Sequence, residues 1–151
     1  MGNNNSTQPS YPAAIPGVIA VGATSINDVR ANFSNMGGHI SVVTPSVGIW
    51  STLPTYAGNT GYRPRPTFPP QPDFTRPLPR DTDYASWDGT SMASPHVTAA
   101  VALLLAKNGP MTPAAVKQKL QTTAIKVSGM QGQNFTQEYG YGRLDLAKLL
   151  Q

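Results

Sequence analysis

The sequence predicts an α/β fold in which helices pack against part of a parallel β-sheet. Residues 18–23 form a continuous apolar run rich in β-branched side chains, which is typical of a strand buried on both faces. Residues 91–107 are apolar at nearly every position, which predicts a helix that is covered on most sides. The chain has 151 residues, enough for one core, and contains no internal repeat. We therefore expect 1–151 to be one portion of a single domain.

The other elements follow in order along the chain. Residues 2–10 are polar and read as a loop. A second strand is expected at 40–43, ended by Pro45, and a third at 48–53. Residues 54–86 are rich in proline and arginine and lack any periodicity, so they predict a long, partly polyproline-like surface loop.

The C-terminal half is expected to be mainly helical. Asn108 and the Gly-Pro pair after it end the 91–107 helix, and we place Pro95 in its first turn. Thr112 and Pro113 then open another helix as N-cap and first residue. A glycine-rich loop covers 128–142. A short final helix over 144–150 has Asp145 in its first turn, where the helix dipole favours an acidic residue.

Composition excludes several classes of function. The net charge is +4 and the basic residues form no run with interleaved aromatics, so we expect no nucleic-acid partner. The absence of cysteine excludes disulfides, cysteine-ligated zinc and a thiol nucleophile. The longest apolar run, 97–106, is too short to span a membrane, and the first residues lack the features of a signal peptide. A low charge content of 12% is common among exported proteins, so we expect the parent protein to be secreted or in the cell envelope.

The nine residues 89–97, Gly-Thr-Ser-Met-Ala-Ser-Pro-His-Val, place Ser91 where a loop enters the predicted buried helix. The first N–H groups of a helix lack partners within it, and its dipole is positive at this end. Both features stabilise an oxyanion that forms beside the serine. The alternative is that Ser91 only caps the helix.

This nine-residue string closely resembles the nucleophile motif of the subtilisin family of serine endopeptidases. Similar family segments are found along nearly the whole chain outside 54–86, at 11–12, 18–23, 30–34, 42–45 and 140–145. The resemblance implies part of a subtilisin-like parallel sheet, hydrolysis of polypeptides through an acyl-enzyme on Ser91, and no required cofactor. It also implies a cis peptide bond between Tyr11 and Pro12, because X-Pro bonds are the ones for which cis is accessible.

Gly2 and Asn3 lie where the family has Ala-Gly-Asn, whose asparagine donates to the oxyanion. The resemblance therefore gives Asn3 this role. Two alternatives stay open, because three consecutive asparagines allow the register to shift by one residue and because a chain terminus is often frayed.

The triad of this family runs Asp, His, Ser along the chain. Asp28, His39 and Ser91 have that order, but neither Asp28 nor His39 has the family's Asp-Thr/Ser-Gly or His-Gly-Thr context, so we assign both to turns. His96 is expected to be a packed, hydrogen-bonded histidine without a triad role. We therefore expect the chain to be the C-terminal part of a peptidase domain, inactive alone, whose partner is the N-terminal part carrying the Asp and the His.

Three further points stay open in the sequence. Family members often bind structural calcium, sometimes through loop carbonyls near the segment matching 13–18, and carbonyl ligands leave no sequence signature. A catalytically dead pseudoprotease fragment that acts as a binding module is the main alternative to an enzyme. A scaffold or adhesive role for 54–86 is the other, since proline-rich segments bind aromatic grooves.

Overall fold

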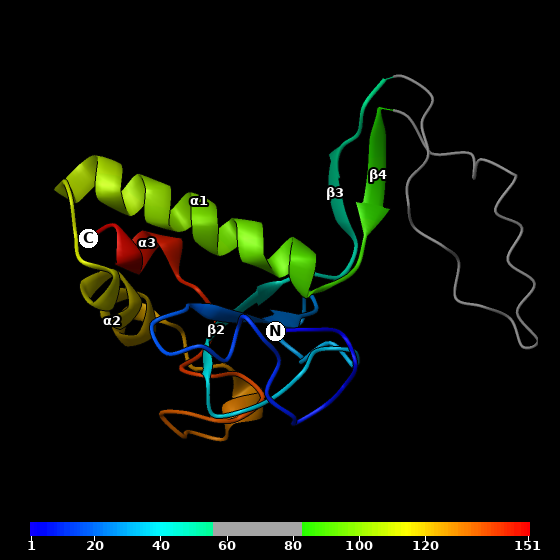
Figure 1. The fold of residues 1–151 in the computed structure, drawn as a ribbon, viewed down its shortest axis with the longest axis horizontal. Helices are drawn as coiled ribbons and strands as arrows, with labels where there is room; N and C mark the ends of the chain where they lie inside the picture. Colours follow the sequence, from blue (N-terminus) through cyan, green and yellow to red (C-terminus); the bar gives the residue numbers. More distant parts are fainter. Residues whose placement is uncertain (56–82) are drawn as a thin grey trace, which may run out of the picture. The chain divides into compact units, whose positions relative to one another are not determined.

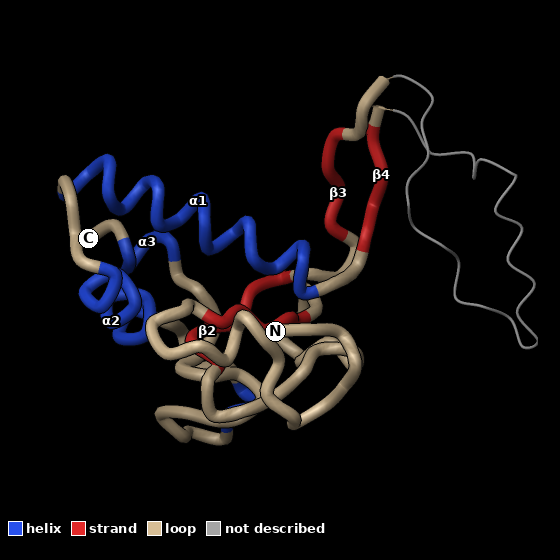
Figure 2. Tube along the Cα trace, in the orientation of Figure 1, coloured by secondary structure: helices blue, strands red, loops and turns tan. Residues whose placement is uncertain are grey.

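A computed structural model describes residues 1–55 and 83–151 of the chain. Contacts divide the molecule into two units, one made of Met1–Ile49 with Trp87–Gln151 and the other of Trp50–Ser86. The first unit holds the predicted strands, helices and candidate site, and is called unit 1 below. Figure 2 shows that loops make up much of it, particularly before its first strand and between its last two helices.

Two parallel strands, β1 (Ala20–Thr24) and β2 (Ile40–Pro45), form the centre of unit 1. Every residue of β1 is buried, as are all residues of β2 before Pro45. The predicted buried, parallel strands are therefore confirmed. The sequence predicted that this strand would end before Pro45, but β2 includes it. A proline can occupy the terminal position of a strand because no ladder donor is needed there.

Both faces of this sheet are covered, which explains why its strands are continuously apolar. Val42 packs into the core formed with the helices, whereas Val43 points the other way and packs with Val127, Met130 and Tyr139. Adjacent residues of a strand face opposite sides of a sheet, so the two valines serve two separate cores. The second core lies under the loop that includes the short 3₁₀ helix η1 (Ser128–Met130), which the sequence analysis did not predict.

Three helices cover the Val42 face: α1 (Thr90–Asn108), α2 (Pro113–Thr123) and α3 (Leu146–Leu149). α1 contacts both strands, α2 contacts β2 and α3, and α3 also contacts α1 (Figure 1). Thr112 caps α2 by accepting a hydrogen bond from Ala115, as its position before Pro113 predicted. α3 is shorter than the predicted 144–150 helix, and Asp145 is its N-cap rather than a first-turn residue.

α1 buries only one side, which differs from the prediction. Ala93, Val97, Ala100 and Leu104 are buried at helical spacing, whereas Leu103 next to them is 49% exposed. The side chains are apolar all round, as the sequence showed, but no described segment covers the outer side. Pro95 is the sixth residue of α1, which begins at Thr90, so it lies in the second turn and not in the first as expected.

The predicted closing segment, 140–145, lies along the free edge of β2. Val43 donates to the carbonyl of Gly142 at 3.0 Å and accepts from Leu144 at 3.0 Å. A Cβ at Gly140 would lie 2.7–2.9 Å from Ile40 and from the Ser41 carbonyl, so only glycine allows this approach.

A second two-stranded sheet is formed by β3 (Ile49–Thr52) and β4 (Tyr84–Trp87). β3 confirms the third predicted strand. β4 corrects the loop prediction, because its first three residues fall within 54–86. Most of that predicted loop, including its arginines, lies outside the described residues. The peptide bond between Tyr11 and Pro12 is cis, as predicted.

Candidate active site

The loop before α1 is attached to the carboxyl end of β2. The backbone N–H of Gly89 donates to the Ser46 carbonyl at 3.0 Å, and the hydroxyl of Thr44 donates to the Ala93 carbonyl at 2.9 Å. Gly89 has φ +150°, which side-chain-bearing residues rarely adopt. Ser91, the second residue of α1, therefore lies at the carboxyl end of parallel strands, where binding sites of open α/β sheets occur.

Asn3 is hydrogen-bonded to the residue before Ser91. Its side-chain oxygen accepts from the Thr90 backbone N–H at 2.9 Å and from the Thr90 hydroxyl at 3.0 Å. A backbone N–H can only donate, so the amide oxygen must face Thr90 and the Nδ2 group must point elsewhere. A Cβ added at Gly89 would lie 3.5 Å from that Nδ2 and 3.7 Å from the Ser91 nitrogen, so this donor lies beside the start of α1.

The segment before and after Asn3 is held by one buried asparagine. The Asn35 side chain accepts from the backbone N–H groups of Asn4, at 2.9 Å, and Ser6, at 3.1 Å, and donates to the Met1 carbonyl at 3.3 Å. The N–H of Asn35 also donates to Gly2 at 3.0 Å. These bonds fix residues 1–6 in one register, so in this structure the asparagine that meets Thr90 is the third residue and not its neighbours.

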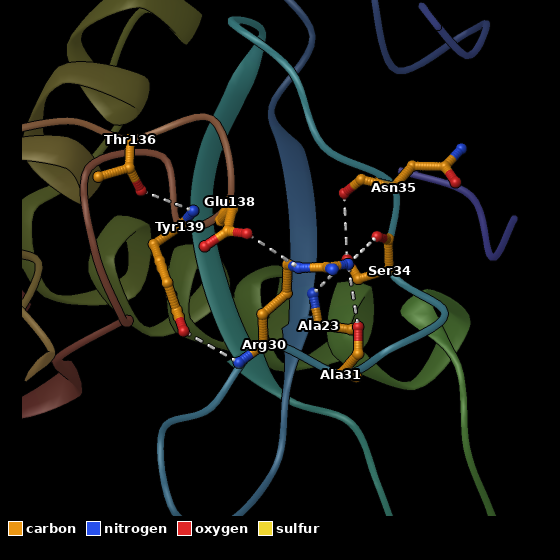
Figure 3. A network of polar contacts seen from close by, with 8 residues as sticks. All are labelled: Ala23, Arg30, Ala31, Ser34, Asn35, Thr136, Glu138 and Tyr139. Atoms are coloured by element: carbon orange, nitrogen blue, oxygen red, sulfur yellow. Dashed lines mark hydrogen bonds and ion pairs between the residues drawn. The ribbon is translucent and has the colours of Figure 1, made fainter. Parts of the chain in front are cut away.

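Asn35 is itself fixed by the 30–34 turn (Figure 3). The Arg30 guanidinium donates to the Ser34 carbonyl at 2.6 Å and lies 3.7 Å from the Glu138 carboxylate. The Arg30 backbone N–H donates to the Tyr139 hydroxyl at 3.1 Å. The turn therefore connects the N-terminal segment, β1 and the loop over the second core.

Among the described residues, Asp28 and His96 each have a partner other than Ser91. Asp28 has φ +59° and its carboxylate lies 3.3 Å from the Arg143 guanidinium. The His96 ring is hydrogen-bonded to the Met92 carbonyl of its own helix at 2.8 Å. It is exposed, so the expected packed position is wrong, because the side of α1 that bears it has no described cover.

His39 lies in the loop before β2, and its pKa is lowered. Burial of the ring is the first cause, followed by the positive charges of the N-terminal amino group and Lys117. Among the described residues none forms a hydrogen bond with its buried Nε2. His39 lies in the turn directly before β2, as predicted, but its ring is half-buried and not fully solvated.

Residues 1–55 and 83–151 contain no group of three or more His, Asp or Glu side chains that could hold a metal ion. The carbonyl-rich turn at 13–18 is the one place to which the sequence analysis pointed for calcium.

An apolar groove runs along the exposed side of α1. Its volume is about 320 Å³, and its lining includes Ala99 and Leu103 of α1, Pro45 of β2, and Leu144 and Leu146 near the C-terminus. Leu103 and Leu146 are 49% and 43% exposed. His96 and Arg143 are the titratable residues of its lining, and the His96 ring is hydrogen-bonded to the Met92 carbonyl of its own helix.

Residues 1–142 match the family model described as the subtilase family, so the chain belongs to this family of serine proteases. It is 38% identical over 124 residues to Subtilisin NAT of Bacillus subtilis subsp. natto, with 82% of this chain and 26% of that protein covered. The structure is similar to that of fervidolysin from Fervidobacterium pennivorans, described as a keratinolytic enzyme related to subtilisin. That match has a TM-score of 0.71 and 34% identity, and covers 97% of this chain and 21% of fervidolysin.

A protease from Pseudoalteromonas arctica is also similar, with a TM-score of 0.72, 25% identity, and coverage of 99% of this chain and 40% of the other. The chain thus spans about a quarter of the length of the curated relatives it matches first, at 25–26%. In the described part of the chain, no helix is both long and apolar enough to cross a membrane.

Sequence reasoning missed two residues that shape this site. Thr90 was read only as part of the nucleophile motif, although its hydroxyl donates to Asn3 and accepts from the Gly2 N–H at 3.2 Å. Asn35 was not singled out. No local pattern could have found it, because its partners lie about 30 residues earlier in the chain.

Proposed function

We propose that this chain is the C-terminal, serine-bearing part of a subtilisin-like serine endopeptidase domain. In this proposal Ser91 is the nucleophile and Asn3 is an oxyanion-hole donor. The observation that carries the proposal is the pair of hydrogen bonds from Thr90 to the Asn3 side-chain oxygen, which turn the amide N–H group away from Thr90 and beside Ser91.

The proposed reaction is acyl transfer. The Ser91 Oγ adds to the carbonyl carbon of a peptide bond while its proton passes to a base, and the carbonyl oxygen becomes an oxyanion. The Asn3 Nδ2 and the Ser91 backbone N–H donate to that oxygen, and the positive end of the α1 dipole favours its charge. The C–N bond then breaks, the amine leaves with a proton from the base, and water hydrolyses the ester on Ser91.

The base and its carboxylate partner are proposed to come from the N-terminal part of the same peptidase domain. Asp28 is paired with Arg143 and His96 with its own helix, so neither is available to Ser91 as described. The apolar groove along α1 supports this proposal, since an exposed apolar surface of this kind commonly marks an interface. The chain alone is then inactive, its substrates are polypeptides, and the reaction requires no cofactor.

The test compares the chain alone with the chain joined to the family segment that bears Asp-Thr/Ser-Gly and His-Gly-Thr. A fluorophosphonate probe reports whether Ser91 is activated, and peptide hydrolysis reports turnover. We expect labelling only in the joined protein and its loss in Ser91→Ala, while Ser94→Ala, an exposed serine of the same helix, should retain it.

Labelling of the chain alone that Ser91→Ala abolishes would show that its own residues supply the base, and Asp28 with His39 would be re-examined first. A well-folded joined protein without labelling would favour the pseudoprotease alternative, a binding module. We also propose that the parent protein acts outside the cytoplasm, as its low charge content of 12% favours.

A further inference from the structure

The turn before β1 is closed by backbone hydrogen bonds of its own. Ala14 donates to the Ser10 carbonyl at 2.8 Å, Ile15 donates to Pro12 at 3.0 Å, and Val18 donates to Ile15 at 3.1 Å. The chain thus closes the turn with its own N–H groups before any ligand is considered.

The carbonyl of Val18, where the turn ends, accepts a hydrogen bond from a lysine. The Nζ of Lys117, on α2, lies 2.9 Å from this oxygen although the two residues are 99 positions apart. Both groups are partly buried at this contact. A charged donor at this distance makes a stronger bond than a neutral one, so the ammonium group directly connects α2 to the start of β1.

A pocket of about 370 Å³ lies at the same place. The turn residues 13–16 and Val18 form one wall, and the other wall includes His39, Lys117 and Tyr141. No aspartate or glutamate lines it, whereas it holds one permanent positive charge and a histidine with a lowered pKa. The charge of Lys117 therefore disfavours a second cation here, and the Gln121 amide, which also lines the pocket, carries no charge to offset it.

We propose that the ammonium group of Lys117 takes the place of a metal cation at the 13–18 turn, so that this chain binds no calcium there. Calcium takes six to eight oxygen ligands, commonly carboxylates, at about 2.3–2.6 Å. An ion on the Val18 carbonyl would lie at most about 5.5 Å from the Lys117 Nζ, where the like charges repel. The turn lacks the carboxylates that would offset this repulsion.

Replacing a metal ion by a lysine side chain changes what holds the 13–18 turn to α2. A bound ion can be removed by a chelator, and its occupancy follows its concentration. A lysine is covalently part of the chain, so the contact is present at any calcium concentration. The inference is independent of the role proposed for Ser91, because it concerns the opposite end of β1.

Amide hydrogen exchange tests the proposal locally in the whole protein, where other calcium sites could obscure a global melt. The amides of Ala14, Ile15 and Val18 report on the turn. We expect the same exchange rates in millimolar calcium and in chelator for the unmodified protein. We expect Lys117→Met to raise exchange at these amides by roughly tenfold, the scale of one charged hydrogen bond. Lys119→Met is the matched control, because Lys119 is on the same helix but does not line the pocket.

Two outcomes would overturn the proposal. One is calcium-dependent protection of these amides in the unmodified protein, an arm that needs no variant and survives any folding defect of Lys117→Met. The other is exchange in Lys117→Met that is no faster than in Lys119→Met. Neither result depends on peptidase activity, so the fate of the Ser91 proposal is read separately.

Discussion

The N-terminus of α1 and its outer side differ in how many partners the described residues supply. At its N-terminus, Gly89, Thr90 and Asn3 are joined by hydrogen bonds supplied by the chain itself. Along its outer side, Leu103 and its neighbours face an open apolar groove. The surroundings of Ser91 are thus fixed by hydrogen bonds among the described residues, whereas the apolar surface beside α1 has no described cover. The difference shows that a hydrogen-bonded helix start does not require that the rest of the helix be covered.

The largest expected effect is on kcat, from substitution of Asn3 at the N-terminus of α1. In the joined, active protein, Asn3→Ala should lower kcat by roughly 10²–10³-fold, the range known for subtilisin when this donor is lost and not a value obtained from this geometry. Asn4→Ala is the matched control and should leave kcat nearly unchanged, since only its backbone N–H is bonded to Asn35. Equal losses in the two variants would mean that the oxyanion donor is misassigned.

Two adjacent leucines of α1 test whether its exposed side is an interface. Leu104→Ala should destabilise the chain by about 2–5 kcal/mol, because Leu104 is fully buried and a cavity would remain. Leu103→Ala should change the stability of the chain alone by less than about 0.5 kcal/mol, as at other exposed sites. Denaturant unfolding measures both. A larger effect of Leu103→Ala in the joined protein than in the chain alone would sharpen the assignment of this side as an interface, and equal effects would contradict it.

Substitution of Thr90 should lower kcat less than substitution of Asn3, because Thr90 acts by positioning the Asn3 side chain. Thr90→Val removes the hydroxyl that bonds Asn3 and Gly2 but keeps the backbone N–H that also holds the amide. We expect roughly a tenfold loss of kcat, the scale of one to two hydrogen bonds, with KM little changed. Thr90→Ser should restore most of the activity. A loss confined to KM would show that Thr90 contacts substrate and does not position Asn3.

The smallest effect concerns pH. The lowered pKa of His39, caused first by burial, means that the folded state disfavours its charged form. Its contribution to stability is therefore complete above its ordinary pKa of 6.5 and is lost as the pH falls through that value toward the lowered one. The melting temperature should fall less between pH 8 and pH 5 in His39→Gln than in the unmodified protein. His96→Gln serves as the control, and a flattening there instead would refute the assignment.

Local patterns predicted most of the regular structure because each pattern depends on residues that are close together in the sequence. The 18–23 run, the Thr112-Pro113 start and the nucleophile motif each correspond to an observed element. β4 was missed because its pairing with β3 depends on a partner more than 30 residues away. The exposed side of α1 was missed for a different reason, since an apolar helix shows what must be covered but not whether the cover is present. The contact of Asn3 with Thr90 is a tertiary fact, and the functional roles of Asn3 and Ser91 stay predictions.

The bond between Asn3 and Thr90 also has a consequence for the order of folding. It joins residues 87 positions apart, so the start of α1 gains this partner only after most of the chain has been brought together. Contacts of such long sequence separation slow folding because the entropy of loop closure is lost before the contact forms. α1 can form locally much earlier, as helices do within microseconds. Ser91 of a folding chain is therefore on its helix well before Asn3 reaches Thr90, so the proposed oxyanion donor arrives after the proposed nucleophile is in place.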